Sequence, residues 1–214
     1  MNAANTSNAM LKAQQLCCVR NDIELFRDLS FELQAGEILQ VEGVNGSGKT
    51  SLLRIMCGLT MPAEGAVLWQ DSPIESCRID YYADMTYVGH NSGLKSNLTC
   101  EENLQVASIS NHFHDDFDIE AAMEKMEIDD LIDEYAGKLS AGQQRRVAMT
   151  RLLLSKAKLW ILDEPFTALD LHSRQRMEQL LDQHCNNGGM AILTTHHELN
   201  VPNTTVNILR IAAS

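Results

Sequence analysis

The stretch GVNGSGKT, from Gly43 to Thr50, constrains the fold of this chain more than any other feature. It follows an apolar segment, Ile38 to Val41, that has the character of a buried strand, and it precedes SLLRIMC, whose apolar residues recur at helical spacing. Glycines at these positions let successive backbone N–H groups point inward, and the following helix adds its positive N-terminal end. A strand, this loop and a helix in succession predict a phosphate-binding loop rather than a chance glycine-rich turn.

The residue types within the loop predict how a nucleoside triphosphate is held. Lys49 is expected to neutralise the β- and γ-phosphates, and the Thr50 hydroxyl is the kind of hard oxygen ligand that Mg²⁺ prefers. The other phosphate contacts are expected from the rest of the loop and the start of the helix, namely Gly43, Val44, Asn45, Gly46, Ser47, Gly48 and Ser51. The expected cofactors are therefore ATP and Mg²⁺.

A second motif is the apolar run LWIL, which ends in the two carboxylates Asp163 and Glu164. A buried strand does not end in this way for packing reasons, because an unpaired buried carboxylate is costly. Asp163 is expected to hold Mg²⁺ through its water shell, and Glu164 to polarise the water that attacks the γ-phosphate. The alternative is that both residues cap the next helix, since Pro165 follows them.

The third motif is LSAGQQ, from Leu139 to Gln144. In a purely structural interpretation, Ser140 is the N-cap of the helix that follows. In a functional interpretation, the helix start formed by Ser140, Gly142 and Gln143 is a second anion site. The two interpretations are compatible with each other.

In this order, the three motifs resemble those of the ATP-binding subunits of ABC transporters. The resemblance implies an ATPase in which two copies close head-to-tail on two ATP molecules, so that LSAGQQ of one copy meets the γ-phosphate bound by the other. It also implies that Asp170, in ALD, lies in the loop that signals between the two ATP sites. His196, in TTH, resembles the residue that senses the γ-phosphate, and the adjacent His197 is the alternative.

The alternation of apolar strands with helical segments predicts an α/β fold with a mostly parallel sheet and flanking helices. The resemblance refines this expectation to a P-loop NTPase of the ABC type, with an antiparallel β edge and a helical subdomain at about residues 90–158. Residues 1–9 are small and polar, and we interpret them as a disordered leader or a remnant of a cloning vector. Residues 10–214 are then a single domain without internal repeats.

Composition excludes several other classes of protein. A net charge of −12 argues against nucleic-acid binding, which needs Lys and Arg to displace counterions. No apolar run approaches the ~20 residues of a membrane span, so direct membrane insertion is not expected. The six cysteines form no CxxC pair and indicate no disulfide framework.

A glycine–histidine string, GHNSGLK from Gly89 to Lys95, narrows the resemblance to one subfamily. It resembles the ATP-binding subunit of the haem-exporter, or cytochrome c maturation, complex of bacterial inner membranes. That resemblance implies integral-membrane permease partners, a location on the cytoplasmic face of the inner membrane, and release of a haem-loaded chaperone driven by ATP hydrolysis. The alternatives are the ATPase subunit of another ABC transporter and a soluble ABC ATPase without a transport role.

Two positions depart from the general pattern of the family. His90 stands where most such ATPases carry a glutamine, and an imidazole is a poor Mg²⁺ ligand that can still hydrogen-bond a water or the γ-phosphate. We expect His90 to act as such a sensor, with Asn91 as the competing candidate. The position expected to stack on adenine falls near Arg20, whose planar guanidinium can stack or can face solvent.

Overall fold

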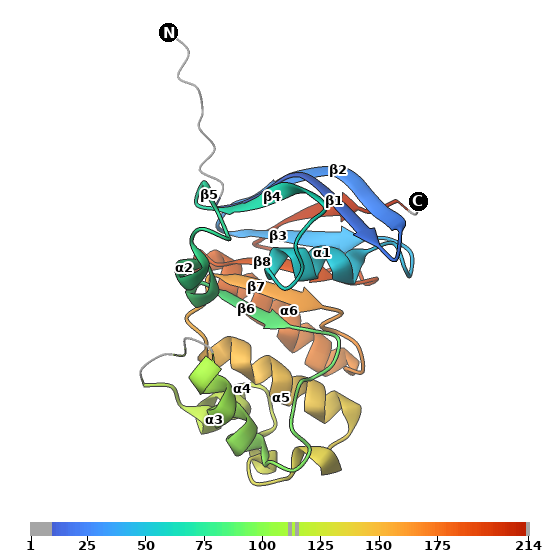
Figure 1. Ribbon diagram of the computed structural model, residues 1–214. Helices are drawn as coiled ribbons and strands as arrows, with labels where there is room; N and C mark the ends of the chain where they lie inside the picture. Colours follow the sequence, from blue (N-terminus) through green and yellow to red (C-terminus); the bar gives the residue numbers. More distant parts are fainter. Residues whose placement is uncertain (1–9, 111–112, 114–115, 213–214) are drawn as a thin grey trace.

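The computed structural model describes residues 10–212, except 111–112 and 114–115. Two β-sheets form one end of the molecule and a group of helices forms the other (Figure 1). The expected leader, residues 1–9, lies outside the described residues. The strands form two separate sheets, and the antiparallel strands have a sheet of their own.

The larger sheet has five parallel strands in the order β6-β7-β8-β3-β9. Their bounds are Met85–Val88 (β6), Leu159–Asp163 (β7), Met190–Thr194 (β8), Glu37–Glu42 (β3) and Thr205–Arg210 (β9). Because the strands run in parallel, their carboxyl ends meet at one edge of the sheet. The phosphate loop after β3, the acidic residues at the end of β7 and the TTH segment after β8 therefore lie close together.

Both faces of this sheet are buried, which explains why its central strands are apolar throughout. Side chains alternate along a strand, so Leu159 and Ile161 of β7 join one core cluster while Trp160 and Leu162 join the other. The first cluster lies between the sheet, α1 (Lys49–Met56) and the antiparallel strands. The second lies toward α6 (Leu171–Asn186) and the helical end of the molecule.

The smaller sheet covers the first core cluster in the strand order β2-β1-β4-β5. Its strands are antiparallel and span Leu11–Arg20 (β1), Ile23–Leu33 (β2), Glu64–Trp69 (β4) and Ser72–Pro73 (β5). A short helix, α2 (Arg78–Ala83), follows and anchors its fully buried Tyr81 on the end of α1 through a hydrogen bond from the phenol to the carbonyl of Met56.

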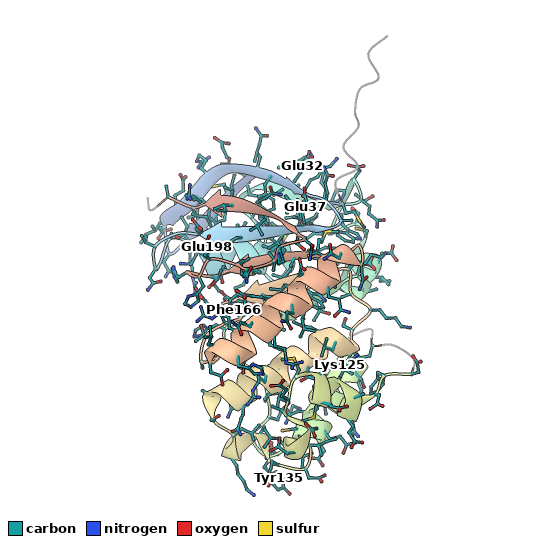
Figure 2. The ribbon with its side chains drawn as sticks, turned by 180° about the vertical axis from the view of Figure 1, so that it is seen from behind. Glu32, Glu37, Lys125, Tyr135, Phe166 and Glu198 are labelled. Atoms are coloured by element: carbon teal, nitrogen blue, oxygen red, sulfur yellow. The ribbon has the colours of Figure 1, made fainter. Side chains whose placement is uncertain are left out.

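The helices at the other end of the molecule form the expected helical subdomain. They are α3 (Cys100–Ser110), α4 (Ile119–Lys125), the two short 3₁₀ turns Asp129–Leu131 and Ala136–Lys138, and α5 (Ala141–Leu154). Figure 2 shows Lys125 and Tyr135 on this end, Glu32 and Glu37 on the sheet end, and Phe166 between them. Phe166 is 4% exposed and belongs to the second core cluster, so the two ends share a continuous apolar core.

Within the part of the chain that the structure describes, none of the helices has the length and apolar character needed to cross a membrane.

One packing contact between α6 and the parallel sheet is sensitive to pH. The His184 ring lies flat against the Trp160 indole, with ring centroids 3.7 Å apart. Burial lowers the pKa of His184 to about 4, although hydrogen bonds to the backbone of Lys158 and Met190 act in the opposite direction. The imidazole is therefore neutral in the folded protein at neutral pH.

This lowered pKa predicts a stability change in acid. The unfolded chain takes up a proton near pH 6.5 and the folded chain only near pH 4, so this group's contribution to stability is complete above 6.5 and is lost as the pH falls toward 4. Because glutamine does not titrate, the Tm of the parent should fall relative to the Tm of His184→Gln as the pH is lowered from 6.5 to 4. Thermal unfolding followed by circular dichroism measures both Tm values. Parallel curves for the two proteins would show that His184 protonates equally in both states.

Candidate active site

The phosphate loop begins where β3 ends and closes on the start of α1. Gly48 is the N-cap of α1 and has a φ of 102°, a left-handed conformation that glycine adopts freely. A Cβ at Gly48 would lie 3.1 Å from the Leu25 side chain, so a larger residue would also crowd β2. The Lys49 ammonium donates to the carbonyls of Gly43, at 2.7 Å, and Val44, at 3.2 Å, so it lies across the loop.

Asp163, at the end of β7, is 2% exposed and joins three elements of the fold. Its carboxylate accepts a hydrogen bond from Thr50 Oγ1 of α1, at 2.9 Å, and another from Thr194 Oγ1 of β8, at 2.8 Å. These hydroxyls supply the partners that a buried carboxylate requires. Both of these hydrogen bonds come from threonine hydroxyls and neither comes from the backbone of the following helix, so they do not match the alternative in which Asp163 caps that helix.

Glu164 leaves the strand with a φ of 51°, in the left-handed region that costs a non-glycine residue about 1–2 kcal/mol. Its backbone is held on both sides in this conformation. The N–H donates to Thr194 Oγ1 at 2.8 Å, and the carbonyl accepts from Arg145 Nη2 at 2.8 Å. The Glu164 carboxylate lies 3.5 Å from His196 Nε2, so a carboxylate and an imidazole from neighbouring strands face each other.

These residues surround an open cavity of about 720 Å³, a size that suits a nucleotide-like ligand. Its lining consists of Arg20, Leu25, Asn45, Gly46, Gly48, Lys49, Thr50, Ser51, His90, Asp163, Glu164, Thr167 and His196. His196 lines the cavity and His197 does not. His90 also lines it, whereas Asn91 lines only a smaller neighbouring cavity of about 240 Å³ between the His90 loop and the start of α5.

Three residues of the predicted loop lie outside the cavity lining, namely Gly43, Val44 and Ser47. The Ser47 hydroxyl is buried close to Gly43 and has no hydrogen-bond partner among the described residues. A Cβ at Gly43 would lie 2.4 Å from that hydroxyl, so a side chain there would displace it. These residues shape the loop around the cavity.

The LSAGQQ residues do not reach this cavity within one chain. Ser140 and Gln143 form a complete capping box at the start of α5, in which each side chain accepts a hydrogen bond from the other's backbone N–H. Gly142 packs against the carbonyl of Ala168, which would lie 2.7 Å from a Cβ at this position. The structural interpretation of Ser140 as an N-cap is confirmed, and the anion site stays a prediction.

Asp170 is likewise the N-cap of a helix, since its carboxylate accepts a hydrogen bond from the Ser173 N–H at 2.7 Å at the start of α6. Hydrogen bonds from the Ser173 backbone and side chain lower the pKa of Asp170 below its ordinary value. Its expected role in signalling between two ATP sites lies outside what a single chain shows.

The donor set at the base of the cavity fits Mg²⁺. Thr50 and Asp163 offer hard oxygens, and Mg²⁺ is commonly held by one or two protein oxygens together with substrate phosphates. Among the described residues no group of three or more His, Cys, Asp or Glu side chains forms a metal site. The protein residues alone therefore provide a partial set of ligands, which phosphate oxygens would complete.

Sequence reasoning missed two residues of the site, Thr194 and Arg145. The Thr194 hydroxyl donates to Asp163 and accepts from the Glu164 N–H, so one side chain positions both acidic residues. Arg145 holds backbone carbonyls beneath the site. The TTH segment contained a signal for Thr194, because a hydroxyl at a strand end beside an acidic strand end suits such a contact.

Thr194→Val is expected to lower kcat for nucleotide hydrolysis by about tenfold or more, because loss of the hydroxyl releases both Asp163 and the Glu164 backbone. Thr194→Ser keeps the hydroxyl and should retain most of the activity. Steady-state kinetics of the two variants measure the effect. Equal activity in Thr194→Val and the parent protein would show that this hydroxyl does not position the acidic residues.

Comparison with known proteins agrees with the geometry of the site. Residues 26–167, which include the phosphate loop and the acidic strand end, match the ABC transporter family. The chain is 46% identical over 194 residues to the cytochrome c biogenesis ATP-binding export protein CcmA of Shewanella oneidensis, covering 91% of this chain and 89% of that protein. It is 45% identical over 200 residues to the protein of the same name from Escherichia coli K12, covering 92% and 94%.

Solved structures show the same fold. An ATP-binding subunit of an ABC transporter superposes with a TM-score of 0.81 at 21% identity, covering 94% of this chain and 88% of that chain. A putative ABC transporter ATP-binding protein from Pyrococcus furiosus gives 0.78 at 24% identity, covering 93% and 96%. Since the family match spans most of the chain and contains both the phosphate loop and the acidic strand end, the chain belongs to the ATP-binding subunits of ABC transporters, a family of ATPases.

Proposed function

We propose that the chain hydrolyses ATP as the ATP-binding subunit of an export complex for cytochrome c biogenesis. The observation that carries this proposal is the pair formed by Glu164 and His196, 3.5 Å apart at a cavity that Lys49 and Thr50 also line. Beside a phosphate-binding loop, a carboxylate can accept a proton from the attacking water and an imidazole can hydrogen-bond the phosphate, so this pair suits hydrolysis of a terminal phosphate.

Each side chain has a definite task in this proposal. Lys49 exchanges its contacts with the loop carbonyls for phosphate oxygens and offsets their negative charge. Glu164 accepts a hydrogen bond from the attacking water and takes up its proton as the water oxygen bonds to the γ-phosphorus and the bond to the leaving oxygen of ADP breaks. The proton then passes to the released phosphate. His196 hydrogen-bonds the Glu164 carboxylate or the γ-phosphate, and His90, which also lines the cavity, hydrogen-bonds a water or the γ-phosphate.

Thr50 and Asp163 would hold Mg²⁺, with the Thr50 hydroxyl as a direct ligand and Asp163 acting through coordinated water. Bound there, the ion would neutralise charge on the β- and γ-phosphate oxygens. Asp163 also keeps the Thr50 and Thr194 hydroxyls in place through two hydrogen bonds within the protein.

The LSAGQQ residues act across a homodimer in our proposal. Within one chain, Ser140, Gly142 and Gln143 do not line the cavity that Lys49 lines, so any contact of this helix start with ATP would be made across the dimer. A second copy placed head-to-tail would bring this helix N-terminus to the γ-phosphate of the first. Asp170, at the start of α6, would then lie near the interface between the two ATP sites.

The proposed membrane partners are the permease subunits of a haem exporter, with this chain docked on the cytoplasmic face of the inner membrane. Identity of about 45% to proteins named for cytochrome c biogenesis export, over nine-tenths of the chain, supports this assignment. The GHNSGLK string from Gly89 also supports it, because it places a histidine at the cavity where most ABC ATPases carry glutamine. ATP hydrolysis would drive release of the haem-loaded chaperone.

The ATPase part of the proposal predicts two different failures. Lys49→Ala should lose ATP binding, since it removes charge that stabilises the bound phosphates. Glu164→Gln should keep ATP binding and lower kcat by at least ~100-fold, since it removes only the group that acts on the water. Binding of a fluorescent ATP analogue and release of phosphate measure the two steps.

Glu198→Gln is the matched control for Glu164→Gln, because Glu198 is exposed and does not line the cavity. It should behave like the parent protein in both assays. With Mg²⁺ and saturating ATP, Glu164→Gln should also become dimeric in light scattering. If Glu164→Gln hydrolyses ATP at the parental rate, Glu164 does not act on the attacking water. If Glu164→Gln stays monomeric, the proposed dimer is contradicted.

The export part of the proposal is tested in bacteria that lack their own subunit of this kind. The parent chain should restore covalent haem in c-type cytochromes, and Lys49→Ala should not, because the complex then has no ATP to hydrolyse. Haem staining of periplasmic proteins after electrophoresis measures the result. Restored staining with Lys49→Ala would argue for a different role.

A further inference from the structure

The Arg145 side chain enters the core of the site from α5 and is 4% exposed. Its guanidinium donates only to backbone carbonyls of two segments that lie far apart in the sequence. Nη1 donates to Gly89 at 2.6 Å and to His90 at 3.3 Å, in the loop after β6. Nη2 and Nε donate to the strand end after β7, where the acceptors are the carbonyls of Asp163 at 2.7 Å, Glu164 at 2.8 Å and Pro165 at 3.3 Å.

These hydrogen bonds begin where the sheet stops. The parallel ladder between β6 and β7 ends at the pair Val88 and Leu162, so Gly89 and Asp163 are the next residues along each strand. Arg145 donates hydrogen bonds to the carbonyls of both residues, beyond the last backbone pair of the two strands. The planar fork of an arginine suits this task because its donors have a fixed geometry and can serve two segments at once.

The charge of Arg145 is also unusual in its surroundings. No carboxylate of the described residues lies within ion-pair distance of it, although Asp163 and Glu164 are close enough to interact with it electrostatically. Burial lowers the pKa of Arg145 and the positive charge of Arg151 acts in the same direction, whereas these two carboxylates act in the opposite direction. Burying a cation that is held by carbonyls alone carries a desolvation penalty, which an apolar side chain of similar volume would avoid. Packing therefore does not explain an arginine at this position.

We propose that Arg145 is a positioning residue for ATP hydrolysis, which holds the Glu164 backbone in its left-handed conformation and fixes the His90 loop against the same strand end. The inference rests on the proposed ATPase function. Thr194 holds the N–H of Glu164 and Arg145 holds its carbonyl, so the conformation that presents the carboxylate to the cavity is fixed at both ends. Because Arg145 lies on the helix that Ser140 opens, it also links this helix to the catalytic strand.

A second arginine on the same helix provides a matched control. Arg151 is partly buried and donates to the carbonyl of Ser92 at 2.6 Å, in the same loop as His90. Its Nε donates to the carbonyl of Ala148, within α5 itself. Arg151 therefore anchors the loop without contacting the strand end, and a comparison of the two arginines separates loop anchoring from positioning of Glu164.

The experiment compares Arg145→Gln, Arg145→Lys and Arg151→Gln with the parent protein. Both Arg145 variants are expected to lower kcat by about 10- to 100-fold, because small displacements of a catalytic group have effects of this size. The Kd of a fluorescent ATP analogue should stay within about threefold of the parent, since the phosphate loop is untouched. Lysine keeps the charge and most of the stem but cannot hold both segments, so Arg145→Lys should not rescue kcat.

Arg151→Gln should keep kcat within about threefold of the parent. Equal losses of kcat in Arg151→Gln and Arg145→Gln would overturn the proposal, and so would an Arg145→Gln protein with parental kcat. Thermal unfolding identifies any variant that does not fold, and Arg145→Lys then carries the test because it keeps the buried volume. In the Glu164→Gln background, Arg145→Gln should lower the residual rate no further, since a residue that acts through Glu164 has nothing left to position.

Hydrogen–deuterium exchange tests the same contacts without reference to activity. Amides in residues 164–168 should exchange faster in both Arg145 variants than in the parent, and at the parental rate in Arg151→Gln. Unchanged exchange in the Arg145 variants would overturn the proposal. If the parent protein itself shows no ATPase activity, the proposed function fails while this exchange comparison still decides whether Arg145 holds the strand end.

Discussion

The rest of the site depends on the hydrogen bonds that the buried carboxylate of Asp163 accepts. It accepts hydrogen bonds from Thr50 and Thr194, so the first turn of α1 and the ends of β7 and β8 meet at one charged group. Burying a carboxylate to 2% exposure is costly unless its oxygens accept hydrogen bonds. Here the two threonine hydroxyls donate those hydrogen bonds. The Thr194 hydroxyl also accepts the Glu164 N–H, so the position of Glu164 follows from the same contact.

The parts of the site that the sequence predicted are those encoded within a few neighbouring residues. The phosphate loop needs glycines at fixed places between a strand and a helix, and its start at Gly43 and the helix that begins at Lys49 agree with the pattern. The central strands of the parallel sheet are apolar throughout because both faces are buried, which made β3 and β7 recognisable. The fold class followed from these elements and their order.

What the sequence did not predict depends on contacts between distant segments. Arg145 bonds carbonyls 56 and 18 residues away, at Gly89 and Asp163, and no local pattern contains that register. The helix that carries Arg145 is buried on most sides, so its apolar residues form no narrow stripe that would show which polar residue points inward. The edge strand β9, with only partial burial, gave too weak an apolar signal to be assigned.

The start of α5 and the catalytic strand end form one packed unit, and this has a consequence for the proposed dimer. Arg145 holds the carbonyls of Glu164 and Pro165, and Gly142 lies so close to the Ala168 carbonyl that a Cβ would come within 2.7 Å of it. The helix N-terminus that would meet the partner's ATP is therefore linked to Glu164, the residue that we propose acts on the chain's own ATP. In the proposed head-to-tail dimer, each ATP would contact the strand end of one chain and the α5 N-terminus of the other, so hydrolysis at one site would alter the geometry at the other.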